Sequence, residues 1–433
     1  MTPTCSPPRG ASLLLRAVSA EQEAEPIVTI VNEKSPTRDR DWSYDLDRDW
    51  SDDEAPRGNC DELVVVANRL PVRFVGDQWV RSPGGLVSAL LPVANKLGGA
   101  WVGWAGVTDR DVTPHCHGGT RLRPVSVCAS EAKEFYEGYS NAGLWPLLHD
   151  AIRPPVHDAA WWHTYQRVNR RFATTVARSA TCGARVLVQD YQLMLVPRML
   201  RELRPDLRIA FFLHTPFPSP DIVATCPEHV ELLHGLLGAD LVGVQTSRDS
   251  RHLRQCAFEL LDADAKPDFV RHGARRTAIG AFPVAIDAGH VHELASRADV
   301  AAHASAIRAS TGAPTDLLLG VDRLDYTKGI ETRLLAYRWL LRAGALDAAS
   351  TPMVQIAVPS REGVLGYGRT KRTVVEITRA INDEFGAPDR PAVHRRLEEL
   401  DETALAAHYR AADVMVVTPI RDGMNLVAKE FIA

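Results

Sequence analysis

The chain has 433 residues, of which 45% are hydrophobic and 24% charged, and a formal net charge of −4 at pH 7. Because a single hydrophobic core seldom grows beyond about 250–300 residues, this length and composition predict a soluble globular protein of two domains. The slightly acidic balance argues against non-specific binding to nucleic acid.

Residues 1–60 are predicted to form a disordered tail. Residues 39–53 mix acidic and basic side chains without a helical or strand period, which is typical of a segment that cannot bury a core. Their D-x-D spacings could suggest a metal site like that of metal-dependent glycosyltransferases, but a disordered charge run is poor support for one. Residues 11–20 resemble a weak signal peptide, which Arg16 interrupts, so we expect a cytoplasmic protein.

Short apolar strands, most of them followed by helical periodicity, recur from residue 61 to the end. Alternation of strands and helices in two blocks predicts two parallel-sheet, Rossmann-like domains, over residues 61–290 and 291–433. A helical stretch at 291–310 lies at the boundary. The expected strands are 63–67, 186–188, 209–213, 241–244 and 279–282 in the first block, and 317–321, 354–358 and 414–417 in the second.

A glycine pair, Gly84 and Gly85, precedes a helix predicted over 87–97. Glycine lets the backbone approach a ligand closely, and the N-terminus of the helix suits an anion. Because glycines end many loops, this pair alone is a weak indication of a site.

The loop at 322–329 lies between a predicted strand and an amphipathic helix predicted over 330–341. In an open α/β sheet, ligands bind beyond the carboxyl ends of strands, and the following helix offers unpaired N–H groups to an anion. Arg323 and Lys328 add a planar guanidinium fork and a mobile ammonium charge. The loop therefore predicts a diphosphate site, with merely solvated cations as the alternative.

Polar side chains also follow three other predicted strands. Asp190 and His214 come after neighbouring strands of the first block, where a carboxylate and an imidazole could bind sugar hydroxyls or move protons. A lone histidine at such a place is more often a structural residue, and this alternative stays open. Arg361 follows a strand of the second block in the same way.

Two further segments suit a sugar ligand. After the last predicted strand, a glycine-containing loop leads to a helix that begins near residue 426, and Asp422 and Glu430 could accept hydrogen bonds from hydroxyl groups there. Tyr136 and Trp145 lie among polar neighbours, and an aromatic face can stack on a sugar ring. Packing in the core is the alternative for these aromatic residues.

The sequence offers little support for a metal or a membrane segment. Seven scattered cysteines without a C-x-x-C pair favour reduced thiols over a disulfide framework. The triplet His115, Cys116 and His117 could be taken for metal ligands, but three adjacent residues cannot easily face one ion, and no second cluster completes the set. No apolar run approaches the ~20 residues that span a bilayer.

Taken together, these segments resemble the trehalose-6-phosphate synthases, glycosyltransferase family 20. They are most similar to the actinobacterial type, in which Gln-Asp-Tyr-Gln, here at 189–192, is familiar. The matching pieces appear in family order, and the long ones near the C-terminus are highly specific. They are residues 67–71, 84–86, 101–104, 139–141, 144–146, 190–191, 214–218, 322–329, 359–361 and 422–430.

The resemblance implies a GT-B fold, in which two Rossmann-like domains hold the active site in the cleft between them. It implies a retaining glycosyltransferase of trehalose biosynthesis that moves glucose from a nucleoside diphosphate glucose, UDP-glucose foremost, to glucose 6-phosphate and forms α,α-trehalose 6-phosphate. The domain at 61–290 would bind the acceptor and the domain at 291–433 the nucleotide sugar. We expect small-molecule substrates as partners, no nucleic acid or membrane, and a homo-oligomer.

The resemblance also implies roles for individual residues. The arginines of the acceptor set would bind the 6-phosphate, Arg323 and Lys328 would neutralise the leaving diphosphate, and Glu430 would hold the ribose. The implied catalytic residues are Asp190, His214, Arg323, Lys328 and Asp422. The implied donor-binding residues are Gly84, Gly85, His214, Arg323, Lys328, Asp422, Asn425, Leu426 and Glu430. The implied acceptor-binding residues are Arg69, Tyr136, Trp145, Asp190 and Arg361.

The implied mechanism requires neither a metal nor a cofactor. Retention of the anomeric configuration through two carboxylates needs a nucleophile close to the anomeric carbon, and no residue of the sequence is clearly that nucleophile. The family is thought to use a front-face mechanism in which the leaving phosphate takes the acceptor proton. The protein then supplies positioning and charge stabilisation, and two fixed cations on the diphosphate remove the need for Mg²⁺.

The chain departs from the family pattern at three places. Gln189 and Gln192 stand where other branches have histidines, and residues 380–384 read Ala-Ile-Asn-Asp-Glu in place of His-Ile-Asn-Gly-Glu. Family members continue beyond the last helix of this chain with further strands and a closing helix. We therefore expect the second domain to be truncated at its C-terminal end. A true terminus at Ala433 would remove part of its sheet and put activity in doubt, and an incomplete gene is the favoured explanation.

Two other functions stay open at this point. A related transferase of the glucosylglycerol-phosphate synthase type would use another acceptor, and a catalytically silent protein would bind sugar phosphates as a sensor. The complete acceptor set favours glucose 6-phosphate over the first, and the presence of Arg323, Lys328, Asp422 and Glu430 argues against the second. The sequence does not distinguish UDP, GDP and ADP donors.

Overall fold

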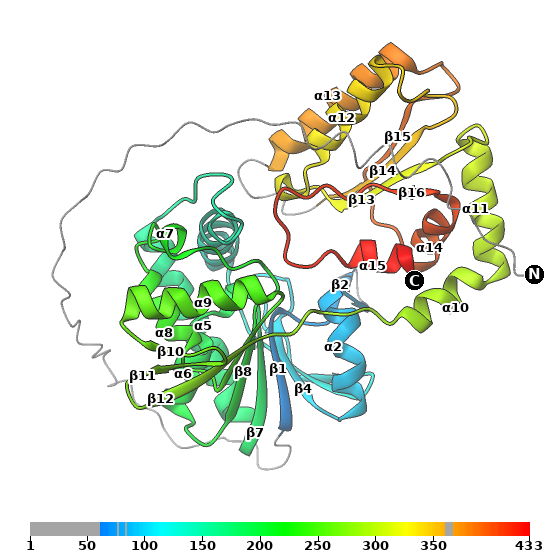
Figure 1. Ribbon diagram of the computed structural model, residues 1–433. Coiled ribbons are helices and arrows are strands. Elements are labelled where there is room, and N and C mark those ends of the chain that lie inside the picture. Colours follow the sequence, from blue (N-terminus) through cyan, green and yellow to red (C-terminus); the bar gives the residue numbers. More distant parts are fainter. Residues whose placement is uncertain (1–60, 76–77, 83–84, 360–366) are drawn as a thin grey trace, which may run out of the picture. The chain divides into compact units, whose positions relative to one another are not determined.

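The structure is a computed structural model that describes residues 61–75, 78–82, 85–359 and 367–433. Two β-sheets, each with helices on both faces, make up most of this part of the chain, and a short hairpin of β2 (Val72–Val75) and β3 (Gln78–Arg81) accompanies them (Figure 1). The tail predicted at 1–60 lies outside the described residues, as do Gly84 and Arg361.

The first sheet has ten strands in the order β10-β11-β12-β9-β8-β7-β1-β4-β6-β5. The strands from β12 to β6 run parallel, whereas β10, β11 and β5 add antiparallel pairs at the two ends. Their bounds are β1 (Asp61–Arg69), β4 (Ala100–Trp104), β5 (His115–His117), β6 (Thr120–Pro124), β7 (Ala180–Gln189), β8 (Arg208–Phe212), β9 (Leu241–Val244), β10 (Asp264–Ala265), β11 (Phe269–His272) and β12 (Arg275–Ala281).

Side chains of β1 alternate between two hydrophobic cores, because successive residues of a strand point to opposite faces of the sheet. Val65 and Ala67 belong to the core that includes α2, whereas Val64 and Val66 belong to the larger core that includes the other helices. Such a strand, buried on both faces, is typical of parallel sheets. The helices of the two faces are α2 (Gly85–Lys96) on one, and α5 (Ala159–Ser179), α6 (Val196–Leu203), α8 (His229–Leu236) and α9 (Ser247–Leu261) on the other.

The second sheet is entirely parallel, in the order β15-β14-β13-β16. Leu319 and Val321 of its central strand pack with α11 and α14, and Leu318 packs with α12 and α13, so helices cover both faces. The bounds are β13 (Leu318–Arg323), β14 (Met353–Val358), β15 (Val393–Arg396), β16 (Val414–Met415), α11 (Ala298–Ser310), α12 (Ile330–Arg342), α13 (Tyr367–Phe385) and α14 (Glu402–Ala411).

The remaining elements are α3 (Ala129–Glu131), η1 (Ala132–Leu144), α4 (Trp145–Leu148), η2 (Tyr191–Leu193), α7 (Pro220–Val223), α10 (Ala288–Ser296), η3 (Tyr326–Lys328) and α15 (Leu426–Ile432).

Each sheet has a point at which the strand order reverses. In the first sheet the chain adds strands on one side of β1 and then returns to place β7 on the other side; in the second sheet β14 and β16 flank β13 in the same way. Ligands of open α/β sheets bind outside the carboxyl ends of the strands at such reversal points. The topology therefore indicates ligand sites beyond β1 and β7 and beyond β13 and β16.

The structure confirms the expected strands and differs in the details of the helices. The helix predicted over 291–310 is two helices, α10 and α11, because the chain leaves the helical conformation at Arg297, where ψ is 144°. Arg323 is the last residue of β13 and not part of the loop. No helix among the described residues is long and apolar enough to cross a membrane. The domain boundary near residue 290 stays a prediction.

Arg333 of α12 makes a buried polar network beneath the carboxyl end of β13. Its Nη1 lies 2.6 Å from Oδ2 of Asp322 and donates to Oε1 of Gln355 at 3.0 Å, while its Nε donates to Oγ1 of Thr418 at 3.0 Å. The two charged side chains are 1% and 3% exposed. Gly320 provides room for this network, because a Cβ at that position would collide with Arg333 and Gln355.

We predict that Arg333→Ala lowers the free energy of unfolding by about 3–5 kcal/mol, because the substitution leaves the buried Asp322 carboxylate without its partner. Urea denaturation followed by circular dichroism measures this loss. Arg297→Ala is the matched control, since it removes an arginine from an exposed pair with Asp299 and should leave stability unchanged. Equal stability of the two variants would contradict the prediction.

Candidate active site

A cavity of about 800 Å³ lies where the reversal points predict a ligand, and residues from the carboxyl ends of both sheets line it. Its size is typical of a small-molecule site. The first sheet contributes Arg69, Asp190 and His214, and the second contributes Arg323 and Lys328. Two groups of residues that are far apart in the sequence therefore share one site.

Two cations of the second sheet face this cavity. Nζ of Lys328 lies 2.6 Å from Oδ2 of Asp422, so this carboxylate holds the ammonium group in place. Cζ of Arg323 lies 5.3 Å from the ring centroid of Trp145, within reach of a cation–π contact. Among the described residues, Arg323 has no carboxylate partner within ion-pair distance, so its charge can be matched by an anionic ligand.

His214 is held in one orientation by Gln189. Nε2 of the imidazole donates to Oε1 of Gln189 at 2.7 Å, which leaves Nδ1 as the acceptor of the neutral ring. Burial lowers the pKa of His214, and the nearby Asp190 opposes this shift only in part. The side chain is therefore a neutral hydrogen-bonding group at neutral pH. The predicted juxtaposition of Asp190 and His214 is confirmed, because β7 and β8 are parallel neighbours.

Asp190 has an unusual backbone conformation, with φ 71° and ψ 169°. This region is populated almost only by glycine, so an aspartate there stores of order 1–3 kcal/mol of strain. The backbone N–H of Asp190 donates to the carbonyl oxygen of Phe212 at 2.8 Å, and its Oδ1 accepts from the N–H of His214 at 3.2 Å. The two strand ends thus hold the carboxylate at the cavity in spite of the strain.

Arg69 marks the other end of the cavity. Its Cζ lies 3.8 Å from the ring centroid of Trp104 and 5.1 Å from that of Tyr136. Gly106 has φ +85°, and a Cβ there would collide with Nη1 of Arg69, so this glycine leaves the space that the guanidinium fills. Tyr136 lies in η1, a π-helical segment, a type of element that is frequent at functional sites. The arrangement presents a fixed positive charge on an aromatic support.

The loop at 418–425, which follows β16 of the second sheet, contacts the residues that follow β8. A Cβ at Gly423 would collide with the carbonyl oxygen of His214, so the close approach requires glycine. Nε of Arg421 lies 2.9 Å from Oδ2 of Asp150, and its Nη2 lies 3.7 Å from Oδ1 of Asp249. These contacts position the loop that carries Asp422.

The structure brings most of the predicted site residues together. Glu430 is not among the residues that line the cavity; it accepts a hydrogen bond from Tyr409 at 2.7 Å, and its predicted contact with a ribose stays a prediction. Gly85 begins α2, and its neighbour Leu86 lines the cavity. The predicted residues at the cavity are Arg69, Tyr136, Trp145, Asp190, His214, Arg323, Lys328, Asp422, Asn425 and Leu426.

Three residues with a place at the site were not singled out for it by the sequence patterns. The ring of His149 packs against that of Trp145, with centroids 4.1 Å apart and planes tilted by 39°, and its Nδ1 donates to the carbonyl oxygen of Trp145 at 2.8 Å. Gln189 orients His214, and Arg421 anchors the loop at 418–425. Gln189 and Arg421 each adjoin a predicted catalytic aspartate, and Gln189 is also one of the two glutamines that stand where other branches of the family have histidines.

The family model of glycosyltransferase family 20 matches residues 61–433. A trehalose-6-phosphate synthase of Mycobacterium avium (strain 104) is 46% identical over 401 residues, which cover 88% of this chain and 80% of that relative. A trehalose-6-phosphate synthase of Mycolicibacterium gilvum (strain PYR-GCK) is 45% identical over 400 residues, with coverages of 88% and 80%.

Solved structures agree with these relatives. The α,α-trehalose-phosphate synthase (UDP-forming) from Burkholderia xenovorans in complex with glucose-6-phosphate aligns with a TM-score of 0.80 at 28% identity, over 86% of this chain and 82% of that one. The E. coli protein bound with UDP-2-fluoro glucose aligns with a TM-score of 0.77 at 28% identity, over 86% and 81%. The predicted GT-B fold is confirmed by these likenesses.

We predict that Arg421→Ala loosens the loop at 418–425, because it removes the guanidinium between Asp150 and Asp249. Hydrogen exchange of peptides that include the Ile420 amide, which donates to the carbonyl oxygen of Thr327 at 2.8 Å, should be accelerated about tenfold or more. Arg276→Ala, at an exposed arginine 3.9 Å from Asp268, serves as control. Unchanged exchange in the Arg421 variant would show that the loop does not depend on this anchor.

We also predict that His214 titrates below the ordinary histidine value of about 6.5, because burial disfavours the charged ring. The unfolded chain then binds the proton more tightly than the folded protein, so this histidine lowers stability as the pH falls below that value. Gln189→Glu should raise the pKa by placing a carboxylate on Nε2. NMR of ¹³C-labelled histidine, with His214→Gln to assign the signal, would refute the prediction if the native ring titrated above 6.5.

Proposed function

The chain belongs to glycosyltransferase family 20, and we propose that it transfers glucose from UDP-glucose to glucose 6-phosphate and forms α,α-trehalose 6-phosphate. The observation that carries this proposal is the presence of fixed cations at both reversal points of one cavity. The reaction has two anionic substrates, a sugar phosphate and a nucleotide sugar, and each requires its own positive charge. Relatives whose names and bound ligands match both substrates support the assignment.

The donor occupies the second sheet in this proposal. Arg323 and Lys328 bind the diphosphate at the carboxyl end of β13, where a guanidinium fork and a mobile ammonium group suit phosphate oxygens. Asp422 holds Lys328 at 2.6 Å before the donor arrives and accepts hydrogen bonds from the donor sugar afterwards. Asn425 caps α15 by accepting from the N–H of Ala428 at 2.9 Å, which fixes the backbone that faces the sugar and phosphate.

The acceptor occupies the first sheet. Arg69 binds the 6-phosphate, Tyr136 and Trp145 contact the sugar ring, and Asp190 orients its hydroxyls. Trp145, which we assign to the acceptor site, also lies next to the donor site, because Cζ of Arg323 is 5.3 Å from its ring centroid. The acceptor hydroxyl can therefore approach the sugar whose diphosphate Arg323 holds. Arg361, outside the described residues, is proposed as a second ligand of the 6-phosphate.

The chemistry that this site favours is a front-face displacement. The acceptor oxygen bonds to the anomeric carbon on the face from which UDP leaves, the bond to the phosphate oxygen breaks, and the hydroxyl proton passes to the leaving diphosphate. The carboxylates that line the cavity, Asp190, Asp322 and Asp422, each have a partner in His214, Arg333 or Lys328. Fixed cations stabilise the leaving group, so the protein contributes positioning and charge.

Several finer properties belong to the same proposal. We place acceptor binding in residues 61–290 and donor binding in 291–433, and we expect that the transfer needs no cofactor and no metal, since Arg323 and Lys328 supply the charge that Mg²⁺ would supply. We expect a homo-oligomer in the cytoplasm, with small molecules as its partners. The described cysteines are all unpaired, which agrees with a reducing compartment.

The test is release of nucleoside diphosphate from UDP-glucose or GDP-glucose, with and without glucose 6-phosphate, in EDTA. We expect release that requires glucose 6-phosphate and survives EDTA. Lys328→Ala should lower kcat/KM by about 10²–10³, as removal of a group that stabilises transition-state charge does. Lys266→Ala, at an exposed lysine beside Asp264, should have no effect.

Other outcomes distinguish the alternatives. Release with glycerol 3-phosphate in place of glucose 6-phosphate would indicate the glucosylglycerol-phosphate type. Binding of glucose 6-phosphate without release from either donor would indicate a silent sugar-phosphate binder. Release that stops in EDTA and returns with Mg²⁺ would show that the two cations do not replace a metal.

A further inference from the structure

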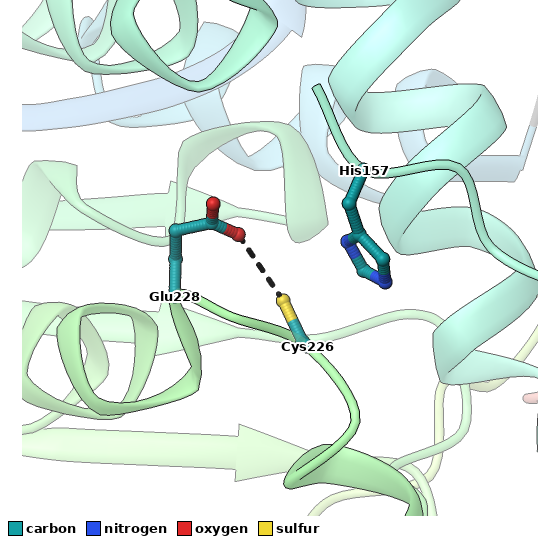
Figure 2. A group of neighbouring side chains, drawn as sticks. All are labelled: His157, Cys226 and Glu228. Atoms are coloured by element: carbon teal, nitrogen blue, oxygen red, sulfur yellow. Dashed lines mark hydrogen bonds between the residues drawn. The ribbon is translucent and has the colours of Figure 1, made fainter. Parts of the chain in front are cut away.

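His157, Cys226 and Glu228 form a cluster outside the cavity described above (Figure 2). Their potential ligand atoms all lie within 4.8 Å of one another, and Cys226 is buried whereas the other two are partly exposed. Figure 2 shows the imidazole, the thiol and the carboxylate pointing toward a common space, His157 from one backbone segment and Cys226 and Glu228 from another. Within the described residues, this is the one group of three such side chains close enough to hold a metal ion.

The backbone holds each of the three residues in place. His157 precedes Asp158, whose carboxylate caps α5 by accepting from the N–H of Ala160 at 2.8 Å. The carbonyl oxygen of Cys226 accepts from Nδ1 of His229 at 2.7 Å, and Glu228 is the N-cap residue of α8. Side chains on backbone that is fixed in this way need little rearrangement to meet a ligand.

The present contacts within the cluster converge on one carboxylate oxygen. The thiol of Cys226 donates to Oε2 of Glu228 at 3.6 Å, and the hydroxyl of Tyr139 donates to the same oxygen at 3.2 Å. A metal ion in this space would replace the weak thiol hydrogen bond with a bond to sulfur. Tyr139 would continue to orient the carboxylate from behind, as outer hydrogen-bond partners of metal ligands commonly do.

A role for Cys226 as a reactive thiol fits less well. Reactive cysteines have a lowered pKa and solvent access, whereas burial raises the pKa of Cys226 to about 12 and its side chain is buried. None of the three residues lines the cavity at the carboxyl ends of the two sheets, so we assign the cluster no part in the transfer. The combination of thiolate, imidazole and carboxylate is instead typical of the ligands that zinc accepts, with a fourth position for water.

We propose that His157, Cys226 and Glu228 bind one zinc ion and thereby fasten the loop before α5 to the turn before α8. This loop also carries Arg153, whose Cζ lies 4.0 Å from the ring centroid of Tyr326 and whose Nη2 donates to Oγ1 of Thr370 at 3.2 Å. Both partners of Arg153 belong to the second half of the chain, next to the loop with Lys328. Zinc would therefore stabilise a segment that contacts the second half of the chain, with no part in the chemical step.

The experiment uses the full chain without an affinity tag, freed of metal by dialysis against EDTA and titrated with Co²⁺ or Zn²⁺. We expect one equivalent of Co²⁺ to bind, with a near-ultraviolet charge-transfer band from the thiolate, and Zn²⁺ to displace it. Zinc should raise the Tm of the wild-type protein. Cys226→Ser should abolish the band, and Glu228→Gln or His157→Ala should weaken binding at least tenfold.

Cys182→Ser is the matched control, because Cys182 is an exposed free thiol that should not affect binding. Circular dichroism and glucose 6-phosphate binding confirm that each variant is folded, and His157→Ala, at a partly exposed loop residue, is the safest of them. No binding of Co²⁺ at micromolar concentration, or a band that persists in Cys226→Ser, would overturn the proposal. Loss of the band in Cys116→Ser instead would also overturn it, by placing the metal on the triplet at 115–117.

Discussion

The end of the cavity at the second sheet, the proposed donor end, depends on the buried guanidinium of Arg333. One side chain binds Asp322 of β13, Gln355 of β14 and Thr418, at which the loop that carries Asp422 begins. Burial raises the pKa of Asp322, and the ion pair with Arg333 opposes that shift. The network thus fixes the end of β13, where Arg323 lies, to the start of the loop that carries Asp422.

The two ends of the site use charge in different ways. At the proposed donor end Lys328 has Asp422 as its resting partner, whereas Arg323 has no carboxylate within ion-pair distance among the described residues. At the proposed acceptor end, Arg69 packs on the rings of Trp104 and Tyr136. Among the described residues no carboxylate lies within ion-pair distance of Arg69, so its guanidinium is available to a phosphate. His214, kept neutral between the two ends, adds hydrogen bonds without adding charge.

Sequence reasoning succeeded where local patterns are strong and failed where contacts are tertiary. The strand at 241–244 has an unambiguous apolar run, and a buried strand followed by a cation-bearing loop was sufficient to place Arg323 and Lys328. The strand β4 was recognised only as a family motif, since two tryptophans and a glycine give no clear period. The π-helical turns of η1 are likewise invisible to apolar spacing. The roles of Gln189 and Arg421 depend on partners 25 to 271 residues away in the sequence, and the contact of Glu430 with Tyr409 could not be inferred from its motif.

Asp190 places stability and activity in direct competition at a single position. Its backbone conformation is one that glycine adopts without strain, whereas its carboxylate lines the cavity and is proposed to orient the acceptor. A glycine at this position would relieve the strain and remove the proposed contact with the acceptor. Selection of variants for heat resistance alone would therefore favour loss of the aspartate, and only selection for turnover retains it. The chain accepts a less stable fold at residue 190 as the cost of a functional group at the end of β7.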